Sequence, residues 1–244
     1  LEEDVVRSTL TLQDPYHIMR TPRGKIICAP HPLLRDIQRR IHETILTDYI
    51  FLNHRVTPRE MHGFIPGRSI LTAARAHLYS DFFLKYDLRN AFGSVTRRRL
   101  MGILTKQPYT YRLFGGANYR TNDPMRFARE FADILLHLTT RNGVLPIGAP
   151  TSPLLFNLVI IDSGLIEHLR QRLRGHRRLI ITLYADDLCI SSWERFSGVA
   201  RNDVHGIIER TTGLQINPGK TRVWRFERSS PRIVGISIAE THTE

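Results

Sequence analysis

The sequence is poor in cysteine, has no long apolar run and has fewer acidic than basic residues. Its 244 residues contain only Cys28 and Cys189, which excludes a disulfide scaffold and a zinc site built on cysteines. No apolar run approaches the roughly 20 residues of a membrane-spanning helix. The acidic start, Leu1-Glu2-Glu3-Asp4, lacks the basic and apolar regions of a signal peptide. These absences predict a protein of the reducing cytoplasm with no membrane partner.

The shortage of acidic residues leaves a large positive charge. Lys and Arg number 35 against 23 Asp and Glu, which gives a net charge of +12 and a pI of about 10.4. Such an excess favours a polyanionic partner without saying which one. Two basic runs, residues 97–99 and 170–178, either follow the phosphates of a nucleic acid or are solvated faces. The 41% of hydrophobic residues suffices for a core in one large domain or two joined subdomains.

Hydrophobic periodicity predicts helices and strands without regular alternation, so the expected fold class is α+β. Residues 107–124 are expected to form a long loop or a weak hairpin, and residues 63–67 a loop. Ser152-Pro153 suits the start of a helix. The predicted helices are 33–52, 69–79, 126–139, 152–175 and 199–210, and the predicted strands are 25–27, 82–88, 179–183 and 188–192. Residues 233–238 are predicted to form a last strand pair or a single strand.

Three aspartates stand in apolar surroundings. Asp186 and Asp187 are adjacent at the tip of the predicted hairpin, and Asp87 ends the predicted strand 82–88. Buried charges are costly unless a cation neutralises them, and oxygen ligands suit Mg²⁺. Two metal ions about 3.5–4 Å apart can stabilise both the attacking and the leaving oxygen in phosphoryl transfer. The alternative is a hairpin turn with a solvated Asp pair, because Asp is a favoured turn residue.

Further segments narrow this choice. In order, the chain carries Asp87-Leu88-Arg89-Asn90-Ala91-Phe92, LPIGAPTSP at 145–153, Tyr184-Ala185-Asp186-Asp187, GLQINPGKT at 213–221 and IVGI at 233–236. Together they resemble the fingers and palm of a reverse transcriptase, most closely a bacterial, retron-type one, over roughly residues 16–239. The resemblance implies a right-hand polymerase fold, with an antiparallel palm sheet packed on helices, plus fingers.

The resemblance also implies the catalytic residues. Asp87 and Asp186 would bind two Mg²⁺ ions, Asp187 would support them, and the carbonyl of Leu88 would complete the shell. Lys220 would protonate or steady the leaving pyrophosphate. The alternative for Lys220 is an exposed lysine after a Pro-Gly turn.

Substrate contacts follow from the same resemblance. Arg23 and Lys25 lie in a segment that resembles the strands gripping the triphosphate, unless they form a solvated turn. Phe92 stands where the family has the steric gate that selects deoxynucleotides, unless it is a core aromatic. The remaining candidates offer backbone N–H groups or close approach to phosphates: Asn90, Ala91 and Gly148.

The sequence departs from the family at a few positions. Ile147 stands where a Gln that contacts the incoming nucleotide is usual. Ala73 replaces Asn in the retron-type Asn-Ala-x-x-His signature that ends at His77, and Val234 replaces Thr in Val-Thr-Gly. His77 itself is expected to be either a helix-surface or a packed histidine.

The implied organisation has four parts. They are fingers over 1–80, palm over 81–106, an insertion in the fingers or palm over 107–144, and palm to primer grip over 145–244. A thumb is expected to be absent. Such a chain is a fragment, receives its thumb from a partner chain, or is a reduced member of the family.

The implied function is that of a nucleotidyltransferase, an RNA-directed DNA polymerase that extends a DNA or RNA primer with dNTPs on an RNA template. A retron or a related bacterial defence or mobile element is the expected setting, with a non-coding RNA and an effector or thumb-bearing chain as partners. Synthesis without a template or with protein priming is a variant of this interpretation. The alternative is an RNA-binding scaffold that does not polymerise without a thumb or a partner.

Overall fold

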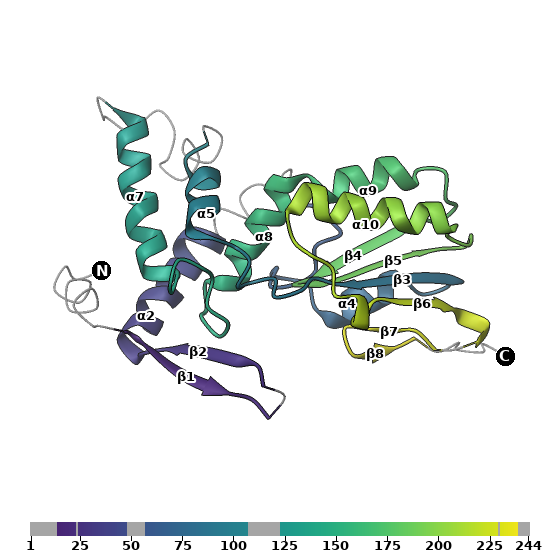
Figure 1. The fold of residues 1–244 in the computed structure, drawn as a ribbon, viewed down its shortest axis with the longest axis horizontal. Helices are drawn as coiled ribbons and strands as arrows, with labels where there is room; N and C mark the ends of the chain where they lie inside the picture. The colour runs from purple at the N-terminus through teal and green to yellow at the C-terminus, as the bar shows by residue number, and fades with distance from the viewer. Residues whose placement is uncertain (1–13, 23, 48–56, 107–122, 229, 239–244) are drawn as a thin grey trace. The chain divides into compact units, whose positions relative to one another are not determined.

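The structure is a computed structural model that describes residues 14–22, 24–47, 57–106, 123–228 and 230–238. The chain forms two compact units. The first contains residues 1–56 and 92–159, and the second contains residues 57–91 and 160–244. Figure 1 shows the elements of each unit, which are described separately below.

The first unit joins a hairpin to helices. Strands β1 (Tyr16–Arg20) and β2 (Ile26–Pro30) pair antiparallel. Helix α2 (Pro32–Arg40) continues as the π-helical segment η1 (Ile41–Thr47), and α5 (Arg97–Leu104) and α7 (Pro124–Thr139) follow. The buried side chain of Gln38 donates hydrogen bonds to the Tyr16 hydroxyl and to the Leu138 carbonyl. One side chain thereby ties α2 to β1 and α7.

The second unit contains a four-stranded antiparallel sheet. Its order is β4 (Ile180–Tyr184), β5 (Asp187–Ser192), β3 (Phe82–Asp87) and β6 (Arg222–Arg225). Around it lie α4 (Ile70–Ala76), α9 (Leu165–Leu173), α10 (Gly198–Thr212), the short pair β7 (Arg232–Ile233) and β8 (Ile236–Ser237), and the 3₁₀ turns η3 (Pro218–Lys220) and η4 (Phe226–Arg228). Helix α8 (Ser152–Ser163) spans the division between the two units.

Strand alternation assigns the two faces of this sheet. Phe83 and Cys189 belong to a buried cluster with Ala74 of α4 and Ile233 of β7. The opposite face carries Tyr86, whose hydroxyl bonds the Arg201 carbonyl of α10. Figure 1 accordingly shows α9 and α10 along one face and α4 with β7 and β8 along the other. The α+β class and the antiparallel sheet expected from the sequence are confirmed.

Some sequence predictions need correction. The helix expected over 152–175 is two helices, because Gly164 adopts φ +64° and the axis bends by 48° there. The helix expected over 33–52 changes to π-helical geometry at Ile41, and residues 48–52 lie outside the described part. The strand expected to include Lys25 begins at Ile26. The loop or hairpin expected over 107–124 lies outside the described residues, except that Asp123 caps α7, which begins at Pro124.

Two elements have weak sequence signals. Helix α5 buries Leu100, Ile103 and Leu104 at helical spacing, but its first turn is the basic run at 97–99, which hides the pattern. Strand β6 is a four-residue edge strand, RVWR, with three exposed residues. Neither element shows a long apolar pattern, and both depend on packing against neighbours.

No single helix among the described residues is long and apolar enough to cross a membrane. Helices α8 and α9 meet the length and composition criteria only as a bent pair. Residues 154–160 of α8 are all buried inside the protein.

Candidate active site

Strand register brings two of the predicted aspartates together. Asp87, the last residue of β3, lies opposite Asp187, the first residue of β5. Opposed residues on an antiparallel pair have Cβ atoms about 5 Å apart on one face of the sheet. Asp186 lies in the two-residue turn between β4 and β5, and its carbonyl accepts the Leu88 N–H at 3.0 Å. The three aspartates therefore gather at one end of the sheet.

Two lysines engage these carboxylates. Lys85 Nζ lies 2.7 Å from Asp187 Oδ2, and Lys220 Nζ lies 3.1 Å from Asp87 Oδ2. Lys220 reaches Asp87 from η3, and the backbone of Asn217 bonds the Asp87 carbonyl beside it. Lys85 is a residue that the sequence analysis missed. Its signal is a charge inside the apolar strand FFLKYD, two residues before Asp87 and so on the same face.

Burial dominates the electrostatics of Asp187. It raises the pKa of this carboxyl above its usual range, Lys85 opposes the shift, and the charges of Asp186 and Asp87 add to it. Asp187 Oδ1 is buried and has no hydrogen-bond partner among the described residues. A buried carboxylate oxygen without a partner is costly and suits a cation.

The donor set fits a divalent metal ion by its chemistry. Carboxylate and carbonyl oxygens are the ligands that Mg²⁺ prefers, and Asp187 Oδ1 is available. In the part of the chain that the structure describes, no three Asp, Glu, His or Cys side chains form a ready-made metal site. Lys85 contacts the other oxygen of that carboxylate, Asp187 Oδ2, and Lys220 contacts Asp87 Oδ2.

The loop at 60–63 braces the Asp186 turn. Leu183 of β4 donates its N–H to the Glu60 carbonyl, and its own carbonyl accepts the His62 N–H at 2.7 Å. A Cβ at Gly63 would lie 2.5 Å from the backbone nitrogen of Ala185. Ala185 itself adopts φ +52°, a conformation that costs free energy for a residue with a side chain. The loop expected at 63–67 is confirmed, but sequence reasoning gave no sign that it holds the turn.

A buried polar network lies on the same face of the sheet, four residues further along β5 from Asp187. His77 places Nδ1 2.6 Å from Ser191 Oγ and Nε2 2.7 Å from Thr182 Oγ1. Ser191 in turn donates to Ser80 Oγ at 2.9 Å. Burial lowers the pKa of His77 to about 3, so the ring is neutral. Of the two expectations for His77, the packed histidine is confirmed.

The turn after β3 holds three more of the predicted residues. Leu88 is buried and forms an isolated bridge with Ile216. Asn90 is exposed with φ +46°, a conformation that Asn tolerates, and Ala91 is buried. These residues belong to the second unit, with the aspartates.

The remaining predicted substrate residues belong to the first unit. Phe92 is half-buried and packs on Phe156 with ring centroids 5.3 Å apart. Gly148 adopts φ +108°, and a Cβ there would meet the Ile27 side chain at 2.8 Å. Ile147 beside it bonds Cys28 of β2 through its carbonyl. Lys25 is exposed between β1 and β2, whereas Arg23 lies outside the described residues.

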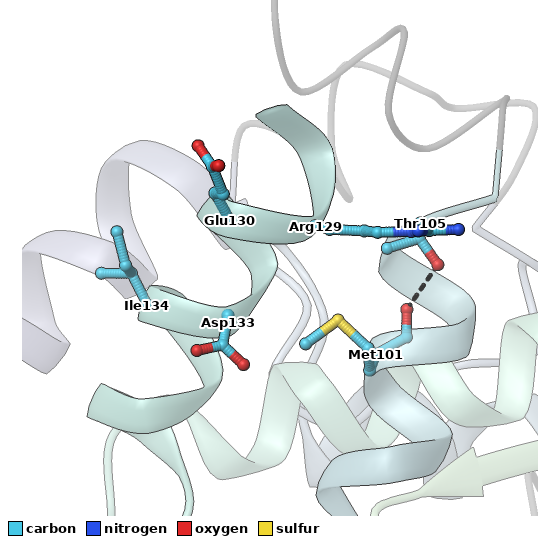
Figure 2. Close-up of a pocket in the computed structure, with 6 residues that line it drawn as sticks. All are labelled: Met101, Thr105, Arg129, Glu130, Asp133 and Ile134. Atoms are coloured by element: carbon cyan, nitrogen blue, oxygen red, sulfur yellow. Dashed lines mark hydrogen bonds between the residues drawn. The ribbon is translucent and has the colours of Figure 1, made fainter. Parts of the chain in front are cut away.

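An open groove between α5 and α7 lies in the first unit (Figure 2). The pocket has a volume of about 680 Å³. Its lining includes Ile134, which is 55% exposed, and Asp133, which pairs with Arg97 of the basic run at 97–99. No predicted site residue lines it.

Comparison with known proteins identifies the family. The sequence pattern of the family described as "Reverse transcriptase (RNA-dependent DNA polymerase)" matches residues 20–238. The chain belongs to the reverse transcriptase family. Family members use divalent metal ions, which agrees with the oxygen donors at the end of the palm-like sheet. The reverse transcriptase domain therefore accounts for nearly the whole chain.

Three curated relatives of the chain are retron reverse transcriptases. The chain is 32% identical to the retron Mx65 reverse transcriptase of Myxococcus xanthus, over 89% of the chain and 48% of that protein. It is 30% identical to the retron Mx162 reverse transcriptase of the same organism, over 88% and 44%, and 30% identical to the retron Ec86 reverse transcriptase of Escherichia coli, over 73% and 49%. The chain thus spans about half the length of these relatives.

Solved structures agree on the fold. Telomerase from Candida albicans matches with a TM-score of 0.56 at 14% identity, covering 96% of the chain and 46% of that structure. Apo telomerase from Candida tropicalis matches with a TM-score of 0.57 at 12% identity, covering 91% and 46%. These similarities support the reverse transcriptase fold.

Proposed function

We propose that this chain catalyses RNA-directed DNA synthesis, extending a primer 3′-end with dNTPs on an RNA template. The observation that carries the proposal is the register pair Asp87–Asp187 with Asp186 in the adjoining turn. A two-metal phosphoryl transfer needs carboxylates from neighbouring strands at one point, and this sheet supplies them. Family membership supports the same reaction class.

Asp87, Asp186 and Asp187 are the proposed ligands of two Mg²⁺ ions, together with the Leu88 carbonyl. Bound there, the ions would lower the pKa of the primer hydroxyl and neutralise triphosphate charge. Lys220, 3.1 Å from Asp87 and largely exposed, is the proposed proton donor to the leaving pyrophosphate. Lys85 keeps the Asp187 carboxylate paired until a cation replaces it.

The nucleotide contacts are proposals of the same kind. Arg23 and Lys25 grip the triphosphate, and Phe92 excludes the 2′-hydroxyl. Asn90, Ala91 and Gly148 are each proposed to bring backbone close to the phosphates, and the positive φ angle of Gly148 supports its part. The division into fingers (1–80), palm (81–106), insertion (107–144) and palm to primer grip (145–244) remains our proposal for the functional parts.

The proposed setting is a bacterial retron or a related defence or mobile element. The names of the curated relatives support a retron. A non-coding RNA as template, and an effector or thumb-bearing chain as partner, belong to this proposal.

An RNA-binding scaffold without polymerase activity is the second candidate. One observation favours it, since lysines engage both opposed carboxylates and no three-ligand group exists among the described residues. Primer extension on an RNA template with Mg²⁺ and dNTPs separates the two. Asp186→Asn abolishes extension under the first proposal, while the control Asp203→Asn on α10 retains it.

The same assay identifies the scaffold. If the unaltered chain binds RNA but extends no primer, and the same holds after a longer form with a thumb is supplied, the polymerase proposal is wrong. Extension that survives Asp186→Asn would remove Asp186 from the site.

A further inference from the structure

Four exposed side chains stack at the end of the sheet remote from the aspartates. The Arg178 guanidinium lies 5.5 Å from the Tyr79 ring centroid and 5.4 Å from that of Trp193. Arg177 lies 5.5 Å from the same Trp193 ring. Tyr79, Arg177, Arg178 and Trp193 are here called the aromatic–arginine cluster. Each contact is within the range of a cation–π interaction.

Hydrogen bonds to backbone carbonyls hold the cluster in place. Trp193 Nε1 donates to the Tyr79 carbonyl at 2.8 Å, and the Trp193 N–H donates to the Arg177 carbonyl at 3.2 Å. Arg178 donates to the Leu78 carbonyl at 3.0 Å. Tyr79 and Arg178 both adopt positive φ, at +65° and +51°. Three chain segments are therefore fixed together so that their rings and guanidinium groups face one another.

The cluster is open to solvent. Tyr79 is 73% exposed and Trp193 is 42% exposed, which is unusual for large aromatic side chains. Both arginines are exposed as well. Exposed aromatic patches of this kind often mark interaction surfaces.

The structure also divides the basic run at 170–178. Arg170 pairs with Glu60, and Arg172 pairs with Asp203. Arg177 and Arg178 have no carboxylate partner among the described residues. Around the cluster, residues 174–178 and 193–195 expose four arginines against one glutamate. The unpaired positive charge of the run is thus concentrated where the aromatic rings are.

The cluster lies at a defined distance from the aspartates along the strands. Strand β3 starts three residues after Tyr79 and ends at Asp87, and β5 runs from Asp187 to the residue before Trp193. Five steps of antiparallel strand correspond to about 17 Å. The cluster is therefore a surface separate from the candidate active site, at the opposite ends of the same strands.

We infer that the aromatic–arginine cluster binds single-stranded RNA outside the active site. Bases stack on aromatic rings and guanidinium planes, and arginines contact phosphates, so the chemistry fits an unpaired strand. An acidic peptide would use the charges but not the exposed ring of Tyr79. The choice of RNA rests on the proposed function, whereas the surface itself follows from the cluster.

Substitution of Tyr79 tests the stacking contribution most directly. Tyr79→Asn removes the ring and keeps a residue that tolerates positive φ, and Tyr79→Phe keeps the ring. We expect Tyr79→Asn to weaken binding of a fluorescent single-stranded RNA about tenfold by anisotropy, since one base loses the aromatic ring on which it stacks. Tyr79→Phe retains the affinity. Arg178→Gln reduces the salt slope of binding, and the control Arg172→Gln, from the same run, does so less.

A second readout reports on the cluster directly. The chain has two tryptophans, Trp193 and Trp224, so Trp224→Phe leaves Trp193 as the only one. Single-stranded RNA should change its emission, and heparin, a polyanion without bases, should not. Equal changes with heparin, or unaltered affinity in Tyr79→Asn, would overturn the inference.

Primer extension keeps this inference distinct from the proposed function. On a short primer–template, Tyr79→Asn should extend as the unaltered chain does. If no form of the chain extends but the ring-dependent RNA binding persists, the polymerase proposal fails and the surface stands. If extension occurs and the ring has no effect on binding or emission, only the surface is refuted.

Discussion

Left-handed backbone conformations at residues with side chains mark the two ends of the sheet in the second unit. Ala185 and Asn90 adopt them beside the aspartates, and Tyr79 adopts one in the aromatic–arginine cluster. Asn tolerates this region, but Ala and Tyr pay roughly 1–2 kcal/mol for it. Such strain persists only where neighbours fix the backbone. At Ala185 the neighbour is Gly63.

Gly63→Ala should disturb the Asp186 turn. The added methyl would lie 2.5 Å from the Ala185 nitrogen, and backbone cannot move aside as a flexible side chain can. We expect a loss of about 1–3 kcal/mol in the free energy of unfolding, typical of overpacking, together with reduced primer extension. Chemical denaturation measures the first effect.

Gly102→Ala is the matched control for that change. Gly102 lies in α5 with nothing within 4 Å of its added Cβ, so alanine there should stabilise by about 0.5–1 kcal/mol through helix propensity. A Gly63→Ala chain as stable as the unaltered one would mean that the loop does not brace the turn.

His77 predicts a pH dependence of stability. Its pKa in the folded chain is about 3 because of burial, with a smaller contribution from His62, against about 6.5 when unfolded. Between these values the unfolded chain binds more protons, so stability is complete above pH 6.5 and falls as the pH drops. At pH 5 the loss from this residue is about 2 kcal/mol.

His77→Gln tests the assignment, because Gln can still bond Ser191 or Thr182 but does not titrate. Urea unfolding between pH 7 and 5 should show a shallower decline for the variant than for the unaltered chain. Parallel declines would show that His77 is not the group that titrates.

At the scale of elements, the β3–β5 pair does two tasks. Its register opposes Asp87 to Asp187, and its shared face carries Lys85 next to them. The same face continues through Cys189 to Ser191 and the His77 network, which anchors α4. The candidate site therefore lies at the end of the strand pair with the longest register in this sheet. The groups proposed to move are lysine side chains.

Lys85→Met should make the fold depend on cations. Lys85 and Asp187 have only 19% and 21% of their side chains exposed, so loss of the pair leaves a buried carboxylate and costs about 2 kcal/mol, below the range for fully buried pairs. Added Mg²⁺ or Mn²⁺ should raise the melting temperature of this variant more than it raises that of the unaltered chain. Thermal unfolding in EDTA and in metal measures both.

Lys220→Met provides the comparison. The Lys220 side chain is 63% exposed, and such pairs contribute about 0–1 kcal/mol, so its melting temperature in EDTA should barely change. If the two variants behave alike, burial of Lys85 has no special role at Asp187.

At the scale of the whole molecule, the net charge of +12 is the dominant property. Pairs such as Arg97–Asp133, Arg141–Asp14 and Arg172–Asp203 neutralise individual arginines without changing this excess. The excess positive charge is available to phosphates. RNA affinity should therefore fall about tenfold or more between 50 and 200 mM salt if three or more phosphates are contacted.

Anisotropy titrations at several salt concentrations measure this slope. The control is a peptide-nucleic-acid strand of the same bases, which lacks phosphates and should show little salt dependence. A flat slope for RNA would remove the electrostatic basis of the proposed RNA binding.

The sequence alone determined the class, the family resemblance and the aspartates. Asp186 and Asp187 are adjacent in the chain, and apolar runs on either side predict the hairpin, because strand propensity and turn residues act locally. The resemblance also pointed to Lys220, which reaches Asp87 across 133 residues. Helix α5 and strand β6 escaped prediction because their patterns are short and charged.

Only the tertiary structure decided which groups meet across the chain. The pairing of Lys85 with Asp187, the approach of Gly63 to Ala185, and the stacking of Tyr79 on Arg178 join segments separated by about a hundred residues. Local secondary-structure propensity cannot predict such contacts, because they depend on strand register and on the sheet face to which each side chain points. The sequence thus determined the chemistry available to the protein, and the sheet decided where that chemistry is assembled.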